Sequence, residues 1–440
     1  MSRKNQEKLI RIALVIATFV MIILRFLLNE KGRVNPDSIR FMRSAHVFPV
    51  IDNTTTPLGY PLSLKVFAIL GFGEFWASKI VGILAFLFII WFAWKKRFYF
   101  RESVLVAGLF SFVSIFAYTM SEPLILPFII LFLYIGRKII IDELSGTKAV
   151  FYLSLILIIL YNIRYPSLFI IGGTLLWGIG NFKKHYGKTF IFSALIGLVF
   201  VILFKFLYID RFNENYVNEF LEIGLHPTSK LLTELFQGLA TSFNPFIHIA
   251  NPTGGVINFG IYGIGLLNIV LMIFLFLKSR LSETQRFFLF IGIVGIICSF
   301  FIQYFYSTTP LDYRLLIAFT FPIWLLYFRK FYQFFGRFAY GITILSLMSG
   351  LVFTWLSKGN YLQNRREIIT FLKFENLENG PLRFYVENPE HLDEVQIAEL
   401  ISTVNPNISW TYNPKDTLKK NVLTAHKVLS KIRIDTNKFQ

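Results

Sequence analysis

Cysteine is almost absent from this chain, and acidic residues are scarce. The single cysteine among 440 residues, Cys298, cannot form an intramolecular disulfide. Lysine and arginine number 44 against 26 acidic residues, but no zinc or RNA-binding motif accompanies the resulting net charge of +18. The histidines show no metal-site spacing either. These features exclude a disulfide-stabilised secreted domain and predict that nucleic acid is not a partner.

Long apolar runs are abundant instead. Hydrophobic residues make up 55% of the chain and the mean hydropathy is +0.57, which is too apolar for a soluble protein of this length. Apolar runs of roughly 17–22 residues recur, and each can cross about 30 Å of hydrocarbon. We therefore predict a polytopic α-helical membrane protein with about eleven spans, the fourth, fifth and tenth of them short: 9–28, 77–94, 103–119, 123–135, 149–161, 166–179, 189–208, 260–277, 287–306, 315–328 and 338–356.

Basic residues gather in alternate loops between these runs, while the other loops are acidic or mixed. Because basic loops stay in the cytoplasm, the pattern predicts the N-terminus inside and, with an odd number of spans, the C-terminus outside. The first run is too long for a removable signal peptide, so we expect it to remain as an anchor. With the lack of disulfides, this indicates a multi-pass protein of the bacterial inner membrane, active at its external, periplasmic face.

The chain divides by hydropathy into a transmembrane module, 1–356, and a soluble external domain, 357–440. The module carries two external loops, 29–76 and 209–259, and LTELFQGL in the second predicts a short amphipathic helix. In the C-terminal domain, RFYVE and ISWTY predict strands, and the segments Leu392–Thr403 and Val422–Ile432 predict helices. We expect a small α/β domain.

The first external loop carries an acid at a helix start. It reads NPDSIRFMRSAHVF and continues to TTPLGYPLSLKVFAILG. Asn35 caps a helix with Pro36 at its first position, so Asp37 falls in the first turn and Arg40 lies three residues on. The helix dipole and Arg40 favour the ionised carboxylate, which could accept a proton from an acceptor hydroxyl. A favourable first-turn acid with no catalytic role is the alternative.

Four arginines, Arg40, Arg43, Arg164 and Arg314, are predicted at outer helix ends, against the positive-inside preference. Their planar forks suit a phosphate group, which predicts a shared anion site. Contacts of single arginines with ordinary lipid headgroups are the alternative.

Glu122 lies in a very short external turn, SEP, which keeps its carboxylate close to the membrane. It could be a metal ligand, a sugar-hydroxyl acceptor or a partner to an arginine; a solvated turn acid is the alternative.

These elements resemble the GT-C superfamily of polytopic glycosyltransferases that use polyprenyl-phosphate sugars, such as protein O-mannosyltransferases and the lipid A aminoarabinose transferase. The first loop resembles theirs, as do YTMSEPLILPFIILFLYIG, YNIRYPSLFIIGG and DYRLLIAFTFPIWLLYF at later helix ends. The resemblance covers the order of elements over residues 9–356, with loose motifs.

The resemblance implies an inverting transfer of a sugar from a polyprenyl-phosphate donor to a lipid, glycan or protein acceptor. Asp37 matches the catalytic acid that activates the acceptor, Arg164 and Arg314 match arginines that hold the lipid phosphate, and Glu122 matches a further acid. Many members carry two adjacent acids in the first loop, whereas this chain has Ser38 in the second place. No cofactor is therefore assigned, and a role for Mg or Mn stays open.

Two other functions fit part of the pattern. A transporter or flippase of a lipid-linked saccharide needs external arginines but no catalytic acid, and it should carry charges deep within its spans. Here the spans are nearly free of charge, with Arg25 and Lys205 as the main exceptions. A glycan polymerase or ligase would use a large external loop such as 209–259, but the acid-bearing first loop favours the transferase.

Overall fold

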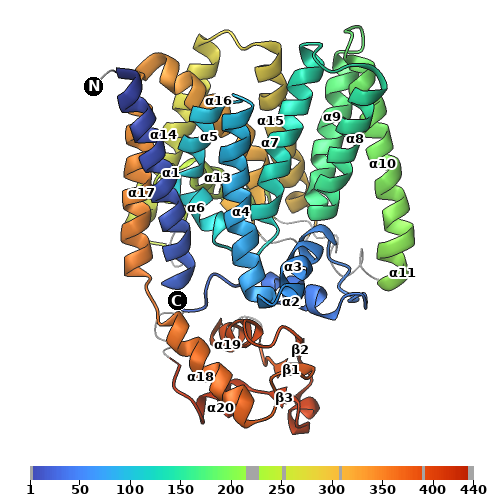
Figure 1. The fold of residues 1–440 in the computed structure, drawn as a ribbon, viewed down its shortest axis with the longest axis vertical. Coiled ribbons are helices and arrows are strands. Elements are labelled where there is room, and N and C mark those ends of the chain that lie inside the picture. Colours follow the sequence, from blue (N-terminus) through green and yellow to red (C-terminus); the bar gives the residue numbers. More distant parts are fainter. Residues whose placement is uncertain (1–2, 215–226, 250–253, 307–309, 389–391, 435–440) are drawn as a thin grey trace.

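The computed structural model describes residues 3–214, 227–249, 254–306, 310–388 and 392–434. Within these ranges, nine helices are long and apolar enough to cross a membrane. They lie side by side in one bundle (Figure 1): α1 (Arg3–Leu27), α4 (Gly73–Lys95), α7 (Glu122–Ile140), α8 (Gly146–Ile163), α10 (Gly187–Phe204, continued by η2, Lys205–Ile209, and α11, Asp210–Phe212), α14 (Val256–Lys278), α15 (Glu283–Phe305), α16 (Tyr313–Phe335) and α17 (Phe338–Leu356).

All eleven predicted runs are helical, but the count of eleven unbroken spans is not confirmed. The third run divides into α5 (Phe100–Ala107) and α6 (Phe110–Phe116). Two contacts with α17 account for the break: a side chain at Gly108 would meet Thr343, and the Phe110 amide donates to Ser346 Oγ at 2.9 Å. The sixth run forms α9 (Leu168–Gly180), only 13 residues long, after the 3-10 turn η1 (Tyr165–Ser167).

The three runs predicted to be short are longer than expected. They correspond to α7, α8 and α16, which have 19, 18 and 23 residues. Polar residues at their ends, such as Glu122 and Arg314, are helical although they lie outside the apolar stretch that hydropathy detects. The apolar runs in the sequence therefore underestimate the length of these helices at the ends that carry Glu122 and Arg314.

The first external loop forms two short helices, α2 (Pro36–Val47) and α3 (Gly59–Ile69). The predicted start of α2 is confirmed: the Ser38 amide donates to Asn35 Oδ1 at 3.1 Å, and Ser38 Oγ accepts in return from the Asn35 amide at 3.1 Å. In the second loop, the predicted amphipathic helix is confirmed as α13 (Thr228–Phe243). Residues 215–226 and 250–253 of that loop lie outside the described residues.

The C-terminal segment forms the expected small α/β unit. It contains α18 (Tyr361–Phe374), β1 (Leu382–Tyr385), α19 (Leu392–Ser402), β2 (Ile408–Thr411), η3 (Pro414–Leu418), β3 (Val422–Leu423) and α20 (Ala425–Leu429). The strands are parallel in the order β2-β1-β3, with Leu382 opposite Ile408 and Arg383 opposite Val422. The helix predicted for 422–432 was wrong at its start, because Val422 and Leu423 are buried in the sheet and Thr424 caps α20 only afterwards.

This unit packs against the first loop rather than standing apart from it. One buried apolar cluster includes Ile39 and Met42 of α2, Tyr361 of α18, and Phe384 and Ile408 of the sheet. Glu399 of α19 is buried and forms an ion pair with Lys31, which follows α1. The C-terminal unit therefore holds α2 in place.

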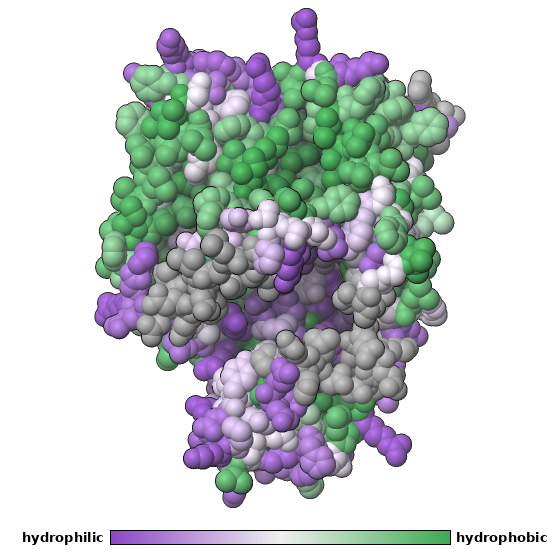
Figure 2. All heavy atoms as spheres, turned by 180° about the vertical axis from the view of Figure 1, so that it is seen from behind, coloured by the Kyte–Doolittle hydropathy of each residue, from purple (hydrophilic) through white to green (hydrophobic). Residues whose placement is uncertain are grey.

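The N-terminus and the C-terminal unit lie at opposite ends of the helical bundle (Figure 1). On the face shown in Figure 2, an apolar belt covers the bundle, and a hydrophilic hollow lies between this belt and the C-terminal unit. A belt of this kind is expected where side chains face lipid. The hollow therefore lies on the polar side of the belt.

Candidate active site

Asp37 projects from the first turn of α2. Its side chain is 43% exposed, so the carboxylate can be reached from solvent. Oδ2 lies 3.6 Å from Arg314 Nη1, and Oδ1 lies 3.9 Å from Arg40 Nη1. Both ion pairs are long, so Asp37 is oriented by two cations without being enclosed by them.

Glu122 begins α7 and is fully buried, with 0% of its side chain exposed. Its Oε1 lies 3.3 Å from Arg164 Nη2 and 3.7 Å from Arg314 Nε. Arg164 also donates from Nη1 to the carbonyl oxygen of Arg314 at 3.4 Å. Of the roles considered for Glu122, the structure supports that of a partner to arginines, and the partners number two.

These side chains surround a cavity of about 210 Å³, here called the Asp37 cavity. Asp37, Arg40, Glu122, Arg164 and Arg314 all line it, together with Thr54, Thr56 and Tyr165. The residues come from α2, the start of α7, the end of α8 and the start of α16. Most of the predicted site is thus brought together from segments far apart in the chain.

Arg43 is the exception among the predicted site residues. Its Nε lies 3.1 Å from Asp52 Oδ2, and it lines a neighbouring cavity of about 270 Å³ together with Arg40, Trp410 and Tyr412. This second cavity lies between α2 and the C-terminal unit, so Arg43 faces away from Asp37.

The carboxylates and arginines of the Asp37 cavity are paired with one another. Asp37 lies within ion-pair distance of Arg40 and Arg314, and Glu122 lies within ion-pair distance of Arg164 and Arg314. Within the described ranges, no three His, Cys, Asp or Glu side chains are grouped so that they could hold a metal ion. The two carboxylates that line the cavity are paired with arginines instead.

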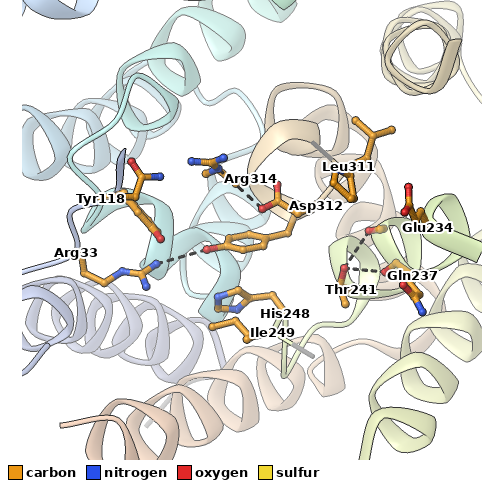
Figure 3. A pocket seen from close by; sticks show the side chains of 14 residues that line it. Arg33, Tyr118, Glu234, Gln237, Thr241, His248, Ile249, Leu311, Asp312 and Arg314 are labelled. Carbon is orange, nitrogen blue, oxygen red and sulfur yellow. Dashed lines mark hydrogen bonds and ion pairs between the residues drawn. The ribbon is translucent and has the colours of Figure 1, made fainter. Parts of the chain in front are cut away.

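A larger cavity of about 480 Å³, here called the Arg33 cavity, shares Arg314 with the first (Figure 3). Arg33, Tyr118, His248 and Tyr313 line it, and sequence reasoning singled out none of these four as site residues. Arg33, like Arg40, is an arginine in an external loop, against the positive-inside preference. The same argument could therefore have predicted it as a site residue. The other three gave no comparable signal, because their proximity arises only from the packing of distant segments.

No family model matches this chain, and no curated protein sequence matches it. Solved structures that align with this chain include the oligosaccharyltransferase of Archaeoglobus fulgidus tethered to an acceptor peptide containing the NVT sequon, at 13% identity and a TM-score of 0.47. The same enzyme with Zn and sulfate matches at 13% identity and a TM-score of 0.44. The alignments cover 92% and 91% of this chain but 64% and 62% of the archaeal one, so this chain spans less than two thirds of that enzyme.

Proposed function

We propose that the protein is a membrane glycosyltransferase that moves a sugar from a polyprenyl-phosphate donor to an acceptor at the external membrane face. The Asp37 cavity carries the proposal. A half-exposed carboxylate faces arginines that lie at the ends of membrane-length helices, on a base of buried ion pairs. The sequence resemblance to GT-C enzymes supports the same function.

Asp37 is the base in this reaction. It takes the proton of an acceptor hydroxyl or amine while the acceptor oxygen or nitrogen forms a bond to the anomeric carbon of the donor. The bond between that carbon and the phosphate oxygen breaks, its electron pair stays on the phosphate, and the configuration inverts. Polyprenyl phosphate leaves as an anion that arginine side chains stabilise.

Glu122 positions arginine side chains and does not contact the substrate. Because its buried carboxylate contacts both Arg164 and Arg314, it fixes two cations that come from different helices. Arg314 in turn contacts Asp37, so the base is oriented by a chain of ion pairs that begins in the core. Such preorganisation is a main source of rate enhancement in charged active sites.

The test replaces Asp37 with Asn, which keeps the size of the side chain and removes its basicity. Cell-envelope glycans and lipid-linked sugars are compared by mass spectrometry between wild type, Asp37→Asn, a deletion strain and the control Arg366→Gln, an exposed residue of α18. We expect the Asn variant to lose one sugar modification and accumulate its lipid-linked donor, as the deletion does. Wild-type glycans from the Asn variant, beside a clear deletion phenotype, would overturn Asp37 as the base and favour the transporter.

A further inference from the structure

The Arg33 side chain lines its cavity and has no carboxylate partner among the described residues. Its side chain is buried, at 8% exposure, and its guanidinium lies over the ring of Tyr118 at 3.8 Å from the centroid. Nη2 donates to Tyr313 Oη at 3.5 Å (Figure 3). Among the described residues, no carboxylate lies within ion-pair distance of Arg33, whereas Arg314 on the shared wall has three.

Other buried cations surround Arg33. Arg25 of α1 and Lys79 of α4 are both close enough to interact with it electrostatically. Lys79 donates to the Ala117 carbonyl and to Thr119 Oγ1 at 2.9 Å each, and Arg25 donates to Ser357 Oγ at 3.2 Å, so both are bound by neutral groups. A buried charge without a counter-charge is strongly destabilising.

One acid lies near these cations. Glu30 interacts electrostatically with Arg25 and Arg33, and burial raises its pKa. Two further carboxylates lie on other walls of the Arg33 cavity, and each has its own partners. Asp312 faces Arg314 at 3.9 Å, while Glu234 lies 3.9 Å from Lys230 and accepts from Gln303 at 2.7 Å. The three basic side chains that interact here, Arg33, Arg25 and Lys79, therefore outnumber the one acid beside them, Glu30.

His248 faces the same cavity with both ring nitrogens unused. It is 3% exposed, and neither Nδ1 nor Nε2 has a hydrogen-bond partner within the part of the chain that the structure covers. Its ring packs against Tyr313 and Phe110, with centroid distances of 4.1 and 4.6 Å. Burial lowers its pKa, as do Arg25 and Arg33, so the neutral ring has one N–H to donate. A buried donor without a partner is destabilising, and a ligand oxygen that accepts from it would remove this cost.

From these observations we propose that the Arg33 cavity is a phosphate site, in which Arg33 and the His248 N–H bind the phosphate oxygens opposite the Asp37 cavity. The identification of this phosphate as that of the lipid-linked donor rests on the proposed function; the site itself does not. Arg164 and Arg314, which the sequence suggested as phosphate ligands, are both paired with Glu122, and of these two only Arg314 lines both cavities. The volume of about 480 Å³ leaves room for more than one phosphate group.

The test measures binding to the purified full-length protein in detergent by native mass spectrometry. The probes are a short-chain polyprenyl phosphate, the corresponding polyprenol and inorganic phosphate. We expect Arg33→Met to weaken binding of the polyprenyl phosphate by about 10- to 100-fold, the worth of a hydrogen bond to a charged group. Binding of the polyprenol should not change, and Arg366→Gln should match wild type.

Stability gives a second readout that a merely structural arginine would not produce. Arg33→Met removes an uncompensated buried charge, so its melting temperature without ligand should equal or exceed that of wild type. If that variant fails to fold, His248→Phe tests the same site, because it keeps a ring of similar size but removes the N–H donor, with a several-fold loss expected. Polyprenyl phosphate binding at wild-type strength in either folded variant would overturn the phosphate site.

Two further outcomes separate the sources and the proposals. Inorganic phosphate that binds as tightly as the lipid phosphate would support the site and overturn the lipid as its source. Asp37→Asn should bind the lipid phosphate as wild type does while transferring no sugar. Asp37→Asn should lose transfer but keep binding, whereas Arg33→Met should lose binding. The two variants therefore test the proposed function and the phosphate site separately.

Discussion

Two cavities meet at Arg314, and they differ in whether their arginines are paired with carboxylates. In the Asp37 cavity all three arginines lie within ion-pair distance of a carboxylate, and the most buried group, Glu122, contacts two of them. In the Arg33 cavity the guanidinium of Arg33 faces two tyrosines and a histidine that lacks described hydrogen-bond partners. Among the described residues, no carboxylate lies within ion-pair distance of Arg33, although Arg314 on the shared wall is paired.

The difference suggests that the two cavities have different roles. A network of ion pairs fixes positions, since each charge is held by its counter-charge, and such rigidity suits a base that must be oriented. A buried cation without a carboxylate partner is instead stabilised by a ligand of opposite charge.

The largest effect should follow from Glu122→Gln. The change removes the carboxylate that the buried Arg164 shares with Arg314, and breaking a buried ion pair in this way costs about 3–5 kcal/mol. Sugar transfer should be lost, and the melting temperature in detergent should fall clearly. Glu143→Gln is the matched control, because Glu143 lies beyond the other end of α7 and is exposed. Equal melting temperatures for the two variants would contradict the role of Glu122.

Arg314→Lys should follow in size. Arg314 contacts Asp37 through Nη1 and Glu122 through Nε, and a lysine has no fork with which to hold both. We expect transfer to fall by about 100-fold, as for an active-site group displaced by about 1 Å. The rate of sugar transfer in membrane vesicles measures this, with Arg366→Lys as control. A rate within a few-fold of wild type would show that catalysis by Asp37 does not depend on the two contacts of the Arg314 guanidinium.

Glu399 links the C-terminal unit to the first loop and should make their stability depend on pH. Burial raises the pKa of Glu399 to about 7 from its ordinary value of 4.5, although Lys31 lowers it. Since the folded state favours the protonated acid, this contribution is fully present below about pH 4.5 and is lost as the pH rises through about 7. Melting temperatures between pH 5 and pH 8 should therefore fall for wild type and stay flatter for Glu399→Gln. Parallel curves for the two proteins would contradict this.

The smallest effect is expected for Arg43→Gln. The Arg43 side chain is 34% exposed, and Asp52 retains the Thr54 amide as a donor at 2.9 Å when the arginine is removed. We expect the free energy of unfolding to fall by about 1 kcal/mol or less, as for partly exposed ion pairs. A decrease as large as that of Glu122→Gln, measured by the same thermal unfolding, would show that Arg43 belongs to the ion-pair network of the Asp37 cavity.

Local signals in the sequence predicted much of this arrangement. The Asn35 cap, the two longer strands and the amphipathic helix α13 follow from residue patterns within a few positions of one another. The convergence of Asp37, Glu122, Arg164 and Arg314 could also be anticipated, because alternate helix ends share one face of a membrane.

The remainder depends on contacts between distant segments. The break between α5 and α6 requires Ser346 of α17, more than 200 residues further along the chain. The Arg33 cavity forms where Tyr118, His248 and Tyr313 come together around Arg33. Gly32 and Arg33 both have positive φ angles, 66° and 61°, a turn that hydrophobic periodicity does not reveal. Packing of this kind leaves no pattern in a single sequence.

The most direct test of the transferase assignment is the mass of the lipid that each variant retains when purified from its own cells. Native mass spectrometry would compare wild type, Asp37→Asn and the double variant Asp37→Asn/Arg33→Met. We predict that Asp37→Asn carries an intact polyprenyl-phosphate sugar that wild type has turned over, and that the double variant carries none. A sugar-bearing lipid in equal amounts on wild type and Asp37→Asn, with unchanged cell-envelope glycans, would contradict catalysis by Asp37.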